Sequence, residues 1–118
     1  MRMPNAFEGT GSQDVFPAGA TIFNEGEPGK TMYIIKEGQV ELRVHGKVVE
    51  TLGPEEFFGE MALVENEPRS ATAIALTDVR LSPITERQFL FLVQETPFFS
   101  LRIMKAMSHR LRKIDKLI

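Results

Sequence analysis

Hydrophobic and polar positions alternate strictly over residues 40–44, where valine or leucine stands at every second position with Glu41 and Arg43 between them. A period of two residues is typical of a strand with one buried face. A His-Gly-Lys sequence at 45–47 then leads into a second apolar run at 48–52. The pattern predicts a β-hairpin.

Similar short apolar runs, bounded by glycine or proline, precede and follow this hairpin. Strands of this length at regular spacing favour a closed sandwich or jelly roll. We therefore expect a mainly β body over about residues 14–85. Glycines mark its predicted corners, at positions 19, 26, 29, 38, 46 and 53.

The pattern changes to helical after a strand near 79–84. Thr85 can cap a helix over 86–93, and Pro97 separates it from a longer helix over about 98–118. Apolar residues of the longer helix recur at alternating three- and four-residue steps, as in a heptad seam. This seam can pack on the β body or pair with a second copy. Its members are Met104, Met107, Leu111, Ile114 and Ile118.

Composition narrows the classes of protein. The chain has 118 residues, 42% of them hydrophobic, and no cysteine, so we expect one domain without thiol catalysis or cysteine-based metal sites. The opening residues 1–5 do not resemble a signal peptide, and no run of about eighteen apolar residues occurs. We expect a cytoplasmic protein without a membrane span.

The net charge of −2 argues against nucleic-acid binding. From residue 102 onward, however, six basic residues face a single acid, Asp115. A solvated helix face is favoured over a nucleic-acid or membrane role as the reason for this imbalance, and cations late in a helix also complement its dipole. The basic residues are Arg102, Lys105, Arg110, Arg112, Lys113 and Lys116.

Two segments, 58–63 and 68–73, carry the chemistry. Gly59 permits close approach of the backbone, and the helical turn predicted to begin at Glu60 directs unpaired N–H groups outward, which suits an anion. Arg69 adds a planar, permanently charged fork that matches phosphate oxygens. An ionised Glu60 can accept a hydrogen bond from a sugar hydroxyl. The pattern predicts a site for a phosphorylated sugar.

These two segments resemble the phosphate-binding cassette of the cyclic-nucleotide-binding domain family. The resemblance runs from about Asp14 onward and includes Phe16 to Gly19, Ile22-Phe23, Glu25-Gly26, and Met32 to Gly38. It implies an α+β fold: an eight-stranded antiparallel jelly roll or β-roll over about 14–85, a short phosphate-binding helix, and C-terminal helices over about 86–118. Residues 1–13 are expected to be a weakly ordered segment or a short helix.

The resemblance also implies roles. Glu60 would bind the ribose 2′-hydroxyl and Arg69 the cyclic phosphate, while the last helix would close over the purine as a lid. Cyclic AMP is the expected ligand, with cyclic GMP as the alternative, and Asp115 could instead be a surface residue. The expected ligand-binding residues are Phe58, Gly59, Glu60, Met61, Ala62, Arg69, Ser70, Ala71, Thr72, Arg110, Ile114 and Asp115.

Other functions fit the residues less well. Glu60 and Arg69 could form a purely structural ion pair, but such a pair has no use for Gly59 or the small residues beside it. A metal site would gather several histidine and carboxylate ligands, and His45 and His109 cannot easily converge. A Ser–His hydrolase would need a serine in a Gly-flanked elbow beside a base, and the sequence has none. Gly29-Lys30 lacks the Gly-Lys-Ser/Thr spacing of a phosphate loop.

We therefore expect a non-enzymatic cyclic-nucleotide sensor without metal or cofactor. By analogy with the family, the last helix favours a homodimer, and an unknown effector protein would receive the signal in trans unless the chain is a piece of a longer protein. The alternative is a dimerisation or docking module that keeps the fold without nucleotide regulation.

Overall fold

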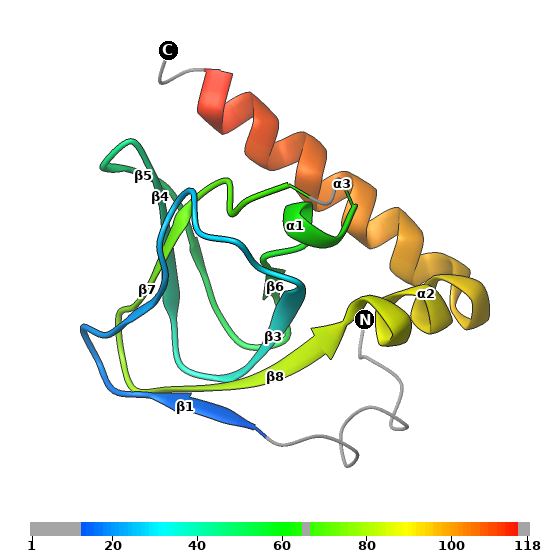
Figure 1. Cartoon of the computed structure of the whole chain (residues 1–118), viewed down its shortest axis with the longest axis horizontal. Helices are drawn as coiled ribbons and strands as arrows, with labels where there is room; N and C mark the ends of the chain where they lie inside the picture. Colours follow the sequence, from blue (N-terminus) through cyan, green and yellow to red (C-terminus); the bar gives the residue numbers. More distant parts are fainter. Residues whose placement is uncertain (1–12, 65–66, 116–118) are drawn as a thin grey trace.

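The computed structural model describes residues 13–64 and 67–115, with the side chains of 64 and 110–115 outside the described set. Its described part is a body of eight strands followed by two helices (Figure 1). The expected β-roll with C-terminal helices is confirmed. The strands are β1 Asp14–Phe16, β2 Thr21–Phe23, β3 Thr31–Glu37, β4 Val40–Val44, β5 Lys47–Leu52, β6 Phe57–Phe58, β7 Thr72–Ala75 and β8 Val79–Thr85.

The strands form two four-stranded antiparallel sheets, one in the order β1-β8-β3-β6 and the other in the order β2-β7-β4-β5. The main hydrophobic core draws residues from both sheets, so the sheets pack face to face. Val40 and Leu42 are buried in this core, as their alternation with charged residues predicts. The core residues are Phe23, Ile35, Val40, Leu42, Leu52, Phe58, Ala73, Ala75, Val79 and Leu81.

The predicted hairpin is present as β4 and β5. Its turn is shorter than the predicted 45–47, because Lys47 already pairs with Val44. His45 (φ 51°) and Gly46 (φ 79°) both adopt left-handed backbone. Two such residues in succession match the right-handed twist of a hairpin, and glycine accepts this conformation without strain.

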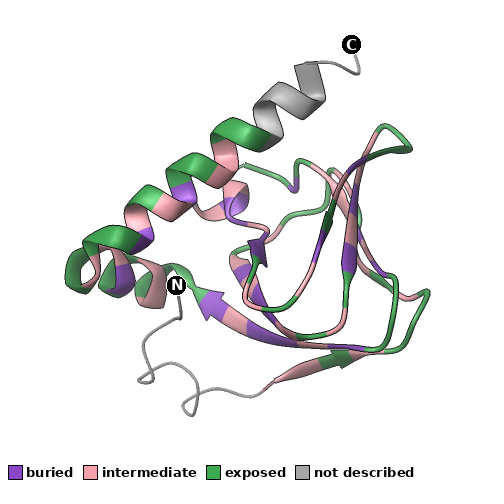
Figure 2. Ribbon diagram, turned by 180° about the vertical axis from the view of Figure 1, so that it is seen from behind, coloured by how far each residue is buried: buried purple, intermediate pink, exposed green. Residues whose placement is uncertain are grey.

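The described residues also form three helices: α1 Met61–Val64, α2 Glu86–Glu95 and α3 Pro97–Asp115. A second hydrophobic cluster joins α2 and α3 to the outer face of the β1-β8-β3-β6 sheet, and Met32 and Ile34 of β3 belong to it rather than to the main core. In Figure 2 the buried segments of α3 lie on the side of the helix that faces the strands. Strand β3 is therefore buried on both faces. The second cluster consists of Met32, Ile34, Phe57, Ile84, Leu92, Phe99 and Ile103.

The apolar seam predicted on the last helix does not act as one face. Met107 is partly buried and packs against the second cluster, whereas Met104 is 60% exposed. The face of α3 that packs on the body is instead formed by Phe99 and Ile103, with Ala106 beside them. The remaining seam side chains, at 111, 114 and 118, lie outside the described residues, as do residues 1–12.

Candidate functional site

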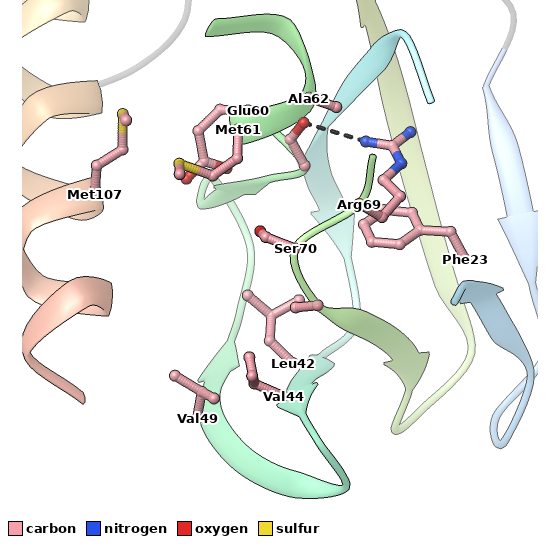
Figure 3. A pocket seen from close by; sticks show the side chains of 12 residues that line it. Phe23, Leu42, Val44, Val49, Glu60, Met61, Ala62, Arg69, Ser70 and Met107 are labelled. Carbon is pink, nitrogen blue, oxygen red and sulfur yellow. Dashed lines mark hydrogen bonds between the residues drawn. The ribbon is translucent and has the colours of Figure 1, made fainter. Parts of the chain in front are cut away.

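A pocket opens between α1, the β4–β5 hairpin and α3 (Figure 3). Its cavity volume is about 80 Å³. Two of its lining residues, Glu60 and Arg69, are buried and ionisable. The lining residues are Phe23, Leu42, Val44, Val49, Gly59, Glu60, Met61, Ala62, Arg69, Ser70, Ala71 and Met107.

The backbone of Arg69 is held by the turn that follows β2. The N–H of Gly26 donates to the carbonyl of Arg69, and the N–H of Arg69 donates to the carbonyl of Glu27, each at 2.8 Å. These two hydrogen bonds fix Arg69 against the turn at 24–27. The side chain therefore starts from a well-defined backbone position and extends toward α1 (Figure 3).

The guanidinium of Arg69 is enclosed, with 6% of the residue exposed. Its Nη1 donates to the carbonyl of Gly59 at 3.1 Å, and its Cζ lies 4.1 Å from the centre of the Phe23 ring. Among the described residues, its Nε has no hydrogen-bond partner. A buried donor without an acceptor is costly, so this arrangement is suited to receive an acceptor from a ligand.

Burial lowers the pKa of Arg69, because removing water disfavours the charged form. Nearby Tyr33, Glu27 and Glu60 act in the opposite direction through Coulombic attraction. Burial also raises the pKa of Tyr33, with Asp14 raising it further and Arg69 lowering it. The electrostatics of the pocket thus centre on a cation that has lost much of its hydration.

Glu60 lies directly before α1 and is 1% exposed. Its carbonyl accepts from the N–H of Leu63 at 3.0 Å, which closes the predicted helical turn. Gly59 has φ 83°, and a Cβ there would come within 2.8 Å of Arg69 Nη1 and 3.2 Å of the Thr31 carbonyl. Both conformation and space therefore require glycine at this position.

Most of the expected cassette residues converge on the pocket, namely Gly59, Glu60, Met61, Ala62, Arg69, Ser70 and Ala71. Phe58 lies in the main core instead, and the Oγ1 of Thr72 accepts from the N–H of Glu25 at 2.9 Å, so neither residue lines the pocket. The side chains of Arg110, Ile114 and Asp115, expected near the purine, lie outside the described residues.

Sequence reasoning missed five lining residues, namely Phe23, Leu42, Val44, Val49 and Met107. Their apolar character predicted burial in the core, and Phe23 and Leu42 are indeed buried. The alternation over 40–44 already placed Leu42 and Val44 on the same strand face. The alternation could not show that this strand face extends from the core into a pocket, because that depends on how the two sheets are arranged at the pocket.

Other types of site are not apparent in the described part of the chain. Within it, no group of three or more histidine, aspartate or glutamate residues is placed to hold a metal ion. None of the helices there is long and apolar enough to cross a membrane.

Two curated relatives are similar to this chain in amino-acid sequence. The chain is 33% identical over 106 residues to the cyclic AMP receptor protein of Thermus thermophilus, covering 86% of this chain and 49% of that protein. It is 46% identical over 81 residues to a cyclic nucleotide-gated potassium channel of Mesorhizobium japonicum, covering 69% and 22%. The chain thus spans about half of the first relative and about a fifth of the second.

Comparison of structures agrees with the sequence comparison. The cAMP-bound structure of PfPKA-R matches with a TM-score of 0.81 and 25% identity, over 90% of this chain and 36% of that one. A family profile described as "Cyclic nucleotide-binding domain" matches residues 13–96, which include both segments of the cassette. This chain belongs to the cyclic nucleotide-binding domain family.

Proposed function

We propose that this domain is a sensor that binds cyclic AMP in the pocket between α1, the β4–β5 hairpin and α3. The observation that carries the proposal is the enclosed guanidinium of Arg69, whose Nε lacks a partner among the described residues. A phosphate oxygen satisfies such a donor and neutralises its charge. Membership of the cyclic nucleotide-binding domain family supports a cyclic nucleotide as the anion.

Each part of the ligand has a suitable neighbour. Arg69 binds the cyclic phosphate, aided by backbone N–H groups at the start of α1, and Glu60 accepts from the ribose 2′-hydroxyl. The purine lies against the apolar side of the pocket, formed by Leu42, Val44 and Val49. Phosphate, sugar and base are thus recognised by different chemistry.

We favour cyclic AMP over cyclic GMP. The described residues on the apolar side of the pocket have no hydrogen-bonding side chain, so they recognise a purine by shape and contact. Guanine carries N1–H, a 2-amino group and O6 on its polar edge, where adenine carries N1 and a 6-amino group, so guanine has more polar groups that the surface leaves unsatisfied. The relative in Thermus thermophilus is named as a cyclic AMP receptor, and the PfPKA-R structure holds cAMP.

Helix α3 serves as lid and output element in this proposal. Met107 belongs both to the lining of the pocket and to the residues packed against the second cluster. Ligand that touches Met107 therefore affects how α3 packs on the body. A homodimer formed through α3, or an effector protein that reads its position, would receive the change.

Calorimetric titration with cyclic AMP, cyclic GMP and 5′-AMP tests the proposal, together with thermal unfolding in each nucleotide. At a ligand concentration one hundred times its Kd, the folded state gains about 2.7 kcal/mol. At equal concentrations of the three nucleotides, we expect cyclic AMP to give the largest gain in the free energy of unfolding. The purified protein should first be unfolded, freed of any retained nucleotide and refolded, so that nucleotide retained during purification does not mask binding. Absence of binding by both cyclic nucleotides would support the alternative of a docking module.

A further inference from the structure

We propose that Phe23 and Gly29 are positioning residues that hold the Arg69 guanidinium in the orientation needed to bind phosphate. The Phe23 ring lies under the guanidinium, with Cζ 4.1 Å from the ring centre. The backbone of Gly29 lies against its Nε side. The inference rests on the proposed binding of a cyclic nucleotide and adds two residues to that site.

Phe23 is a rigid support for the cation. It is 8% exposed at the end of β2, and its ring centre lies 5.8 Å from that of Phe58 and 6.4 Å from that of Tyr33. The rings of Tyr33 and Phe58 are themselves stacked at 5.5 Å. Because three aromatic rings brace one another, the ring face presented to Arg69 is fixed before any ligand arrives.

The ring also compensates for lost hydration. The charge of Arg69 is disfavoured by burial, which lowers its pKa. The electron-rich face of an aromatic ring attracts a guanidinium, and this attraction is stronger where water is excluded. The ring attracts the cation without using any of its N–H donors.

Gly29 contributes by having no side chain. A Cβ at this position would lie 2.2 Å from Arg69 Nε and 2.5 Å from Cζ, which is closer than any real contact. Its φ lies outside the left-handed region, so the backbone conformation does not by itself require glycine. The space taken by the guanidinium is therefore the reason that glycine fits here.

Binding measurements on matched variants test both residues. Phe23→Leu removes the ring, and we expect roughly tenfold weaker binding of cyclic AMP, the loss expected for one desolvated cation–π contact. Binding of adenosine, which has no phosphate, should change little. Combining Phe23→Leu with Arg69→Gln should add no further loss to that of Arg69→Gln alone. Equal losses for cyclic AMP and adenosine, or simple addition in the double variant, would show a general packing role and overturn the proposal.

Gly29→Ala has its own matched control. Gly53 also lacks a left-handed φ, and a Cβ there would meet nothing closer than Glu56 Oε1 at 3.9 Å. We expect Gly29→Ala to weaken cyclic AMP binding at least tenfold and Gly53→Ala to leave it unchanged. If Gly29→Ala binds like the parent protein, the part of the proposal that concerns Gly29 is wrong.

One further measurement does not depend on nucleotide binding. The Cζ of Arg69 lies 4.1 Å from the centre of the Phe23 ring, so we expect ring current to shift the NMR resonance of the adjoining Nε–H proton upfield in the ligand-free protein. The resonance is assigned to Arg69 by its absence from the spectrum of Arg69→Gln. The shift should disappear in Phe23→Leu and change in Gly29→Ala. An ordinary shift in the parent protein would overturn the positioning role, whereas a shifted resonance without any cyclic nucleotide binding would overturn only the proposed function.

Discussion

At the scale of single residues, the pocket combines an acidic and a basic side chain that are both almost fully buried. Glu60 is 1% exposed and Arg69 6%. Burying ionisable groups costs free energy unless they find partners, and such groups concentrate at functional sites. The short sequence distance between them, on either side of α1, lets one local segment supply both charges.

Removing the Arg69 guanidinium should abolish tight binding of cyclic AMP. We expect Arg69→Ala to weaken cyclic AMP binding by about 2–5 kcal/mol, because a bound phosphate would be enclosed without its cation. This corresponds to roughly thirty- to several-thousand-fold in Kd. Calorimetric titration measures it directly. Arg80→Ala is a suitable control, since Arg80 is partly exposed and donates to Gln13 and Glu37 rather than into the pocket. Parent-like affinity of Arg69→Ala would mean that phosphate binds elsewhere.

The pKa of Tyr33 is a second measurable property of the site. Burial raises it, and Arg69 partly offsets the rise. Tyr33 is the only tyrosine of the chain, so phenolate absorbance reports it alone. We expect a midpoint above the ordinary value of about 10, and a still higher one in Arg69→Gln.

The raised pKa of Tyr33 determines how its contribution to the free energy of unfolding changes with pH. Above about pH 10 the unfolded state loses the phenolic proton before the folded state does, so the folded protein binds more protons. The contribution of Tyr33 is therefore complete below that pH and is lost as pH rises through the folded pKa. Urea unfolding of Tyr33→Phe beside the parent protein measures it. A difference in unfolding free energy that stays constant to high pH would contradict the raised pKa.

Gly59, Glu60 and Arg69 could be predicted from the sequence because their chemistry is local: each residue type suits the task, and the three lie within eleven positions. Phe23 and Met107 could not be. They reach the pocket only through β2 packing against β7 and α3 packing on the body. An apolar residue has no sequence signal that separates a core position from a ligand-contacting one.

At the scale of elements, boundaries agree with prediction where a capping residue or turn defines them. Helix α2 begins after Thr85 as expected, because Thr85 and Gln88 form a capping box. It ends at Glu95, two residues beyond the expected end, since nothing before Pro97 interrupts it. Of the predicted heptad seam, Met104 does not pack on the body, because the face of α3 that packs there carries Phe99 and Ile103. Pairing of the seam with a second copy stays a prediction.

The capping box gives a prediction at this scale. The N–H of Gln88 donates to Thr85 Oγ1 at 3.3 Å, and the N–H of Thr85 donates to Gln88 Oε1 at 2.9 Å. We expect Thr85→Ala to lower the free energy of unfolding by about 1 kcal/mol. Urea unfolding measures this loss. Gln94→Ala, an exposed substitution within α2, should change stability far less, and equal losses for the two variants would argue against the cap.

At the scale of the whole molecule, α3 connects the pocket to the second hydrophobic cluster. Phe99 and Ile103 anchor its first half, and the rings of Phe89 and Phe99 meet edge to face at 5.6 Å. Met107 then reaches the pocket about one turn further along. The helix is thus anchored at one end by apolar packing and lines the pocket at its middle, which supports the lid role proposed above.

Hydrogen exchange of the α3 amides tests this connection. Because cyclic AMP would add contacts at Met107, we expect slower exchange in α3 when it is bound. Ile103→Ala should raise exchange in α3 without ligand and reduce the slowing caused by cyclic AMP, since Ile103 is 4% exposed within the cluster. Met104→Ala is the matched control, because Met104 follows Ile103 in α3 and is 60% exposed. If saturating cyclic AMP leaves exchange in α3 unchanged in the parent protein, α3 is not a lid, and any output must leave the domain through the β4–β5 hairpin or another surface.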